Sequence, residues 1–243
     1  MPIDLDSIRK ASPNASPAIS PNAQTDTGLH DYMRAIYNYM AGGLALTGIV
    51  AYYACATGLY LSIAKTPLIW VVLFAPLAMV LFLGFRINKM SLATAQITYW
   101  AYAALMGLSL AGIFMIYTGE SIARVFFITA GTFGGMSVYG YTTRTDLSRF
   151  RSFLMMGLIG VIIASLVNIF LHSSALQFAV SVIGVIVFVG LTAYDTQKFK
   201  ALYAAGDSRD SMGKKVVMGA LTLYLDFINL FLMLLRLFGG RRS

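Results

Sequence analysis

Residues 216–235 read VVMGALTLYLDFINLFLMLL, an apolar run whose only formal charge is Asp226. An α-helix needs about 20 such residues to cross a bilayer, so this run has the length of a membrane span. An ionisable side chain at membrane depth is costly and rarely faces lipid. Asp226 therefore predicts that this helix faces protein or water, and it makes residue 226 the first candidate for a functional role.

The rest of the chain supplies further spans of the same kind. Uncharged runs cover residues 35–64, 66–85, 90–119 and 125–143, and a longer one, 152–194, is divided by the polar turn His172-Ser173-Ser174. With 216–235 these runs predict seven transmembrane helices in an all-α domain of residues 35–238. Short connections would group the first six into three hairpins, which we expect to surround the last helix. Residues 1–34, rich in Ser, Pro and Asn, are expected to be a disordered tail, and residues 239–243 a short basic end.

Composition excludes several other classes of protein. Hydrophobic residues make up 58% of the chain and charged residues 12%, against about 25% charged in soluble domains, so an ordinary globular enzyme is excluded. Continuous apolar runs exclude a transmembrane β-barrel. Cys55 is the only cysteine, and His30 and His172 are far apart in the sequence. We therefore expect no disulfide within the chain, no histidine metal cluster and no cofactor.

The distribution of positive charge predicts the orientation in the membrane. Thirteen of the eighteen Lys and Arg residues fall on the amino-terminal side of a seven-span chain, which places that side and the tail in the cytoplasm. Because the eighteen are scattered between spans and not clustered, the net charge of +8 predicts no nucleic-acid partner. The remaining five are Lys65, Arg124, Arg236, Arg241 and Arg242. The last three would face outward, so a re-entrant final segment is an alternative at this point.

Two aspartates and one arginine are the main candidates for function. Thr222, Asp226 and Asn229 recur at helical spacing and predict one polar face on the last span. Asp195 lies near the cytoplasmic end of span six, and Arg86 closes span two at the same level, where it would either latch Asp195 or extend to lipid headgroups. A helix end in water would also explain Asp195, and hydrogen bonds to neighbouring polar groups would explain Asp226. Asp226 lies about 15 Å inside Val216, so spacing alone does not pair the two acids.

The glycines of span four, Gly131, Gly134, Gly135 and Gly140, are interpreted as sites of close helix packing. They need no ligand to explain them.

Three segments resemble a known family. They are GGMSVYGYTT at 134–143, AYDTQ at 193–197 and ALTLYLDFINLF at 220–231, and FRIN at 85–88 fits the same pattern. In this order they are similar to the Bax inhibitor-1 family, in its bacterial YccA-like branch. The resemblance implies a protein of the bacterial inner (plasma) membrane, with seven helices and the last enclosed by the other six.

The resemblance also implies a function, a pH-sensitive passive leak of calcium across the lipid bilayer. Asp195 and Asp226 would be a di-aspartyl proton sensor that binds calcium transiently as the transported ion, and Arg86 would latch Asp195. Thr222 and Asn229 would support the polar face. The direction of the pH response does not follow from these residues, because protonation weakens both the latch and the cation site.

Two other functions compete with the leak. An intramembrane aspartyl protease would also use two membrane aspartates, but Asp226 lacks the glycine that flanks the acid in those enzymes, and their Pro-Ala-Leu segment is absent. We therefore expect no enzymatic activity. The YccA resemblance implies instead that the chain binds and modulates a membrane-bound AAA quality-control protease, with the tail as the contact.

Overall fold

The computed structural model describes residues 21–242, with side chains described from Thr27 onward. Seven helices within this range are long and apolar enough to cross a membrane, which confirms the predicted all-α membrane protein. These helices are α2 (Pro21–Ala56), α4 (Leu68–Arg86), α5 (Leu92–Leu110), α7 (Gly119–Thr142), α8 (Arg151–Leu171), α9 (Ser174–Ala201) and α10 (Arg209–Phe238). Short helices α3 (Leu59–Ala64), α6 (Ile113–Ile116), η1 (Ile87–Lys89) and η2 (Leu147–Phe150) lie in the connections.

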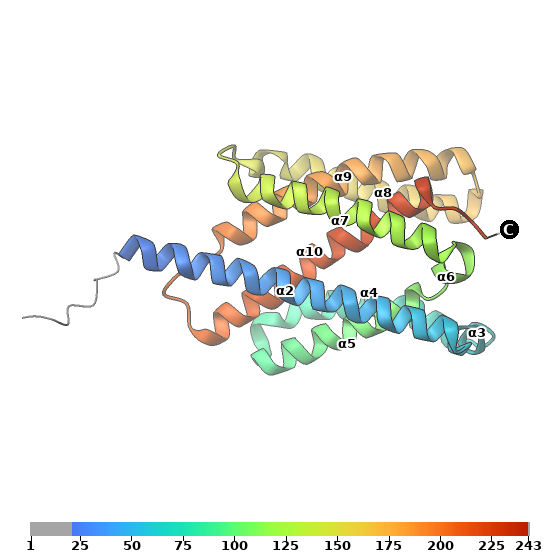
Figure 1. Cartoon of the computed structure of the whole chain (residues 1–243), viewed down its shortest axis with the longest axis horizontal. Coiled ribbons are helices and arrows are strands. Elements are labelled where there is room, and N and C mark those ends of the chain that lie inside the picture. The colour runs from blue at the N-terminus through green and yellow to red at the C-terminus, as the bar shows by residue number, and fades with distance from the viewer. Residues whose placement is uncertain (1–20, 243) are drawn as a thin grey trace, which may run out of the picture.

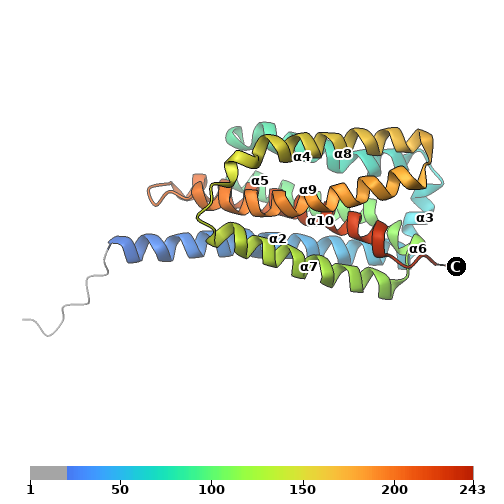
Figure 2. The same ribbon diagram turned by 90° about the horizontal axis from the view of Figure 1, so that it is seen from above.

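The bundle has two ends that differ in what they contain. Helices α2 and α10 both begin at one end, called here the N-end, and the chain terminates at the opposite C-end (Figure 1). The connections η1 and η2 lie at the N-end, and α3, α6 and the α8–α9 turn lie at the C-end (Figures 1 and 2). Most of the cations counted above therefore gather at the N-end. Its position in the cytoplasm stays a prediction from the charge rule.

The first helix is longer than its apolar run. Helix α2 starts at Pro21, so residues 21–34, expected as part of a disordered tail, are helical. Tyr32 and Met33 are buried in this extension, and the Tyr32 ring lies 5.6 Å from that of Tyr203. Charges at Asp31 and Arg34 end the uncharged run without ending the helix, because a helix can continue beyond the bilayer. The expected disorder of residues 1–20 lies outside the described residues.

The turn between α8 and α9 follows the prediction from sequence. Helix α8 ends at Leu171, and His172 takes the left-handed conformation with φ 50°. Ser173 then caps α9, because its side chain accepts a hydrogen bond from the amide of Leu176. The Asn168 side chain accepts the Ser173 amide at 3.0 Å. The uncharged run 152–194 is therefore two spans, as predicted.

Helix α10 is the most buried span. In its most hydrophobic window 72% of the residues are buried, against 11% in α8. It packs against α9 and α7 on one side and against α2 and α5 on the other, and Figure 1 shows it crossing obliquely between these groups. Its enclosure by all six other spans stays a prediction.

The carboxyl terminus is fixed to the C-end by backbone contacts. Arg241 forms an antiparallel bridge with Tyr117, the Arg242 amide donates to the Ile116 carbonyl at 2.9 Å, and the Gly240 amide donates to Ser121 Oγ at 2.7 Å. We call residues 239–242 the terminal strap. Helix α10 is one continuous helix from the N-end to this strap, which favours a complete crossing over a re-entrant last segment.

One of the four glycines of α7 fulfils the packing role expected for all of them. A Cβ built on Gly140 would overlap the Ala193 carbonyl oxygen on α9, whereas at Gly131, Gly134 and Gly135 it would meet nothing within 4 Å. The interpretation was therefore wrong for these three, which are exposed or half-buried without a neighbour. Gly140 alone among the four sets the separation of α7 and α9.

We expect Gly140→Ala to destabilise the protein by about 1–3 kcal/mol, because the new methyl group must push α9 away from α7. Gly134→Ala is the matched control, and helix propensity predicts no loss of stability there. Thermal unfolding of the purified protein in detergent measures both. Equal melting temperatures for the two variants would contradict the close contact.

Candidate functional site

Asp195 lies inside the bundle, two turns before the end of α9. Its side chain is buried and pairs with Lys198 on the next turn, with 3.2 Å between Asp195 Oδ1 and Lys198 Nζ. Arg151, the first residue of α8, adds a second attractive charge. The Lys198 amino group also stands 5.1 Å from the centre of the Phe199 ring. Asp195 is therefore part of an ion pair at the edge of an apolar interior.

Three neighbouring elements hold the Asp195 segment in place. The Thr196 and Tyr37 hydroxyls lie 3.3 Å apart and join α9 to α2. The Gln197 side chain accepts the Leu147 amide at 2.8 Å and donates to the Thr145 carbonyl at 2.9 Å, which fixes the connection between α7 and α8. With the close contact at Gly140, these bonds position the acid from α2, α7 and η2.

Asp226 is buried without a complete set of hydrogen bonds. It is 5% exposed, and among the described residues its Oδ2 atom has no partner. A buried carboxylate oxygen with no donor is costly unless a proton or a cation compensates it. No structural hydrogen bond from a Tyr or Asn side chain reaches this atom, so the group is poised to take up a positive charge.

The structure brings Asp195 and Asp226 together. The two carboxyls interact electrostatically, and Lys198 acts on both. A count inward from Val216 separates them in depth, but α10 begins seven residues earlier, at Arg209, and crosses the bundle obliquely (Figure 1). Two buried acids and one partly exposed lysine therefore act on one another between α9 and α10.

The predicted supporting residues, one helical turn before and after Asp226, form hydrogen bonds within α10 itself. Thr222 donates to the Met218 carbonyl at 2.9 Å and Asn229 to the Leu225 carbonyl at 2.8 Å. Both side chains are half-buried, whereas Asp226 is buried. Their polar groups are thus satisfied within the helix, and neither is hydrogen-bonded to the acid.

Arg86 is not paired with Asp195 in this structure. Its side chain is exposed at the carboxyl end of α4, which lies at the N-end of the bundle, and it forms no ion pair within the part of the chain that is described. Helix α4 packs mainly against α5, and α9 is not among its main neighbours. Lys198 takes the position expected for Arg86. The spacing of Asp195 and Lys198, three residues apart on a helix, is a sequence signal that would have suggested this pair.

Aromatic side chains of α7 and α10 pack together beginning at Phe227, the residue after Asp226. The Phe227 ring lies 5.4 Å from Phe126 and 5.5 Å from Phe133, both on α7, and Phe126 also contacts Phe231 at 6.3 Å. Sequence reasoning missed this cluster, because α7 and α10 are far apart in the chain and phenylalanine is common in any membrane span.

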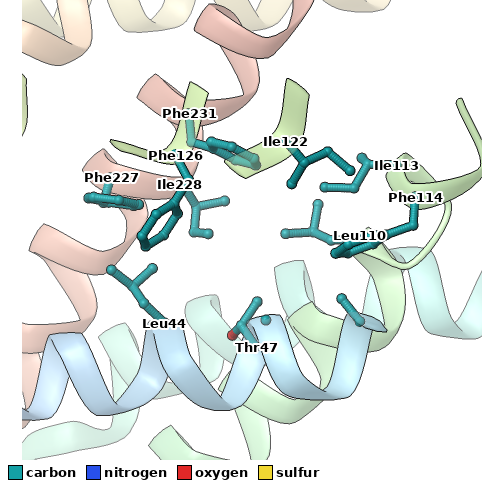
Figure 3. A pocket seen from close by; sticks show the side chains of 12 residues that line it. Leu44, Thr47, Leu110, Ile113, Phe114, Ile122, Phe126, Phe227, Ile228 and Phe231 are labelled. Carbon is teal, nitrogen blue, oxygen red and sulfur yellow. The ribbon is translucent and has the colours of Figure 1, made fainter. Parts of the chain in front are cut away.

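An apolar cavity of about 80 Å³ adjoins the aromatic cluster. Figure 3 shows Phe126, Phe227 and Phe231 on one side of it and Thr47 of α2 on another. The Thr47 hydroxyl lies 2.7 Å from that of Tyr224 and donates to the Ala103 carbonyl at 2.8 Å. The aromatic cluster therefore forms one wall of the cavity, and the hydrogen-bonded Thr47 of α2 forms another.

Comparison with known proteins places this arrangement in a family. The model of the family "Inhibitor of apoptosis-promoting Bax1" matches residues 29–243. The inner membrane protein YbhL of Escherichia coli K12 is 49% identical over 234 residues, covering 95% of this chain and 98% of YbhL. The protein RP147 of Rickettsia prowazekii is 51% identical over 226 residues, covering 92% of this chain and 95% of that protein. A membrane protein of Streptococcus pyogenes, SpyM3_0260, is 35% identical over 219 residues, covering 89% of this chain and 95% of its own length.

We expect Asp226→Leu to stabilise the fold by about 1 kcal/mol or more, because it removes a buried oxygen that lacks a hydrogen bond. Thr222→Val, which removes a hydroxyl already bonded within the helix, is the control and changes stability little. The free energy of unfolding in detergent at neutral pH measures both variants. If Asp226→Leu unfolds the protein, the acid is a structural group and its role as a functional site fails.

Proposed function

The chain belongs to the Bax inhibitor-1 family, described as Inhibitor of apoptosis-promoting Bax1, and on this premise we propose that it forms a pH-sensitive passive leak for calcium across the membrane. The observation that carries the proposal is Asp226, a buried carboxyl with an unpartnered oxygen beside a second acid. A cation in a low-dielectric passage needs such a site to offset the loss of its water shell.

The two aspartates have different parts in the proposed leak. Asp226 lies deeper and attracts the ion, whereas Asp195 shares its charge with Lys198 at 3.2 Å. Ca²⁺ takes six to eight oxygen ligands, so two carboxylates hold it only with the help of water and backbone carbonyls. Weak, incomplete ligation suits an ion that must leave as well as enter.

Protonation acts on this site in two opposing ways. A proton on Asp195 weakens its attraction for Lys198 and so frees the end of α9, which favours opening. A proton on Asp226 removes the negative charge that attracts the cation, which lowers conduction. Because the acids interact, they titrate as a pair. The leak therefore depends on pH through both acids, and a variant with one acid loses part of that dependence.

In this structure Lys198 pairs with Asp195 and so competes with a passing cation for that carboxylate. The pairing of Arg86 with Asp195 stays a prediction. The exposed Arg86 side chain reaches Asp195 only if α4 moves toward α9. The two residues therefore act in different conformations. Lys198 affects flux in the present arrangement, whereas Arg86 affects flux only in a conformation in which α4 has moved toward α9.

The aromatic cluster is the proposed barrier on the C-end side. Phe126 and Phe227 line the apolar cavity, and Phe133 packs on Phe227, the residue that follows Asp226 on α10. Packed phenyl rings leave no water to solvate an ion, so the passage is closed at this level. Opening requires these rings to separate.

We expect calcium flux into liposomes holding the purified native chain to change between about pH 5 and pH 8. Asp195→Asn and Asp226→Asn flatten this pH dependence, and Asp226→Asn also lowers the flux, because it removes the charge that attracts the ion. Lys198→Met changes the flux at neutral pH, and Arg86→Ala tests the latch. Thr222→Val, which removes a hydroxyl that is hydrogen-bonded within α10, is the control and leaves the pH dependence unchanged. Identical flux from all variants, or no flux above that of empty liposomes, rejects the leak.

We expect Phe126→Ala to raise calcium flux at neutral pH severalfold, since about 1 kcal/mol less barrier is already a factor of five. Phe127→Ala makes the same change on the next residue, whose side chain is 73% exposed, and leaves flux unchanged. The same liposome assay measures both. Equal flux in the two variants contradicts a barrier at this cluster.

A further inference from the structure

A second site lies at the C-end, apart from the acidic pair. Three adjoining cavities of about 300, 240 and 190 Å³ lie among α8, α9 and α10, and Arg236 lines all three. Neither Asp195 nor Asp226 lines any of them. We call these cavities together the Arg236 groove.

The outer part of the Arg236 groove is polar and positively charged. Asn168 and Gln177 line it together with Arg236, and Arg241 of the terminal strap joins them. Within the described residues, neither arginine forms an ion pair. Glu120, which begins α7 at the same end, is already paired with Arg124 at 2.8 Å. Among residues 27–242, no acid therefore pairs with the two arginines of the groove.

The polar groups of the groove lie close to the ends of their helices. Arg236 is two residues before the end of α10, Gln177 is in the first turn of α9, and Asn168 is in the last turn of α8. At 1.5 Å per residue all three are within about 5 Å of a helix end. A membrane boundary at the helix ends would place them beside phosphates.

The inner part of the groove is lined mainly by apolar side chains, with Ser165 and Asn229 as polar exceptions, and it has the length of an acyl chain. Along α8 it is lined from Leu158 to Ile169, opposite Phe188 of α9 and Leu232 of α10. Eleven residues of helix rise about 16 Å, which is half of a hydrocarbon core of about 30 Å. Ile162 and Ile169 are at least half exposed, so a chain can enter sideways from the bilayer.

We propose that the Arg236 groove binds one phospholipid that carries a net negative charge. Its phosphate contacts Arg236 and Arg241, the amides of Asn168 and Gln177 complete the headgroup contacts, and one acyl chain fills the space between α8 and α10. A zwitterionic headgroup has no net charge with which to balance the two positive charges of the arginines, so the groove favours an anionic lipid. A bound anionic lipid also explains why arginines occur at the C-end of the bundle, where the positive-inside rule disfavours them.

Native mass spectrometry of the purified chain tests the proposal, with phosphatidylglycerol and phosphatidylcholine of the same acyl chains as probes. We expect the native chain to retain one phosphatidylglycerol in preference to phosphatidylcholine. Arg236→Gln and Arg241→Gln each weaken that retention by about tenfold, as expected for loss of one charge-assisted contact. Arg124→Gln removes a cation at the same end but outside the groove, and it leaves retention unchanged.

A second variant tests whether the shape of the groove contributes to lipid binding independently of its arginines. Ser165→Trp fills the inner part, where residue 165 is half-buried, and reduces retention while both arginines remain. A melting curve for each variant establishes that it is folded. Equal retention of the two lipids, unchanged retention in Arg236→Gln, or full displacement by free glycerol phosphate would overturn a site for an anionic lipid.

Discussion

The burial of Asp226 is the constraint on which the rest of the structure depends. A carboxyl in the middle of the most buried helix has one oxygen without a hydrogen-bond donor among the described residues. Such a group is costly in an apolar interior, and proteins keep local violations of this kind mainly where function requires them. The surrounding helices place a second acid, Asp195, and one lysine beside it, and they do not supply a permanent partner for that oxygen.

The two halves of the bundle serve this acid in different ways. Toward the N-end, ion pairs and side-chain hydrogen bonds fix the end of α9, with Lys198 and Gln197 as the central contacts. Toward the C-end, phenyl rings from α7 and α10 close the interior, and the terminal strap binds the start of α7 through Ser121. A polar, titratable side and a dry, packed side therefore meet at Asp226. The proposed gated leak rests on this asymmetry.

Much of the fold could be predicted from sequence, because each transmembrane helix is recognised from one continuous run of apolar residues. The turn at His172 and the apolar runs fixed seven helices, and a lone acid in the last run marked Asp226. The pairing of Asp195 with Asp226 could not be derived from spacing, because it depends on the oblique course of α10. The role of Lys198 was missed although its helical spacing from Asp195 was visible. The glycines of α7 looked alike in sequence, and only the position of α9 distinguishes Gly140.

The most direct measurement of the central claim is binding of a cation at Asp226. Terbium replaces calcium at oxygen ligands and luminesces when a nearby tyrosine is excited, and Tyr224 lies two residues before Asp226. In detergent at neutral pH, the native chain and Thr222→Val should show terbium luminescence that calcium displaces, and Asp226→Asn should lose it. Luminescence of equal strength and equal calcium sensitivity in Asp226→Asn would contradict the account.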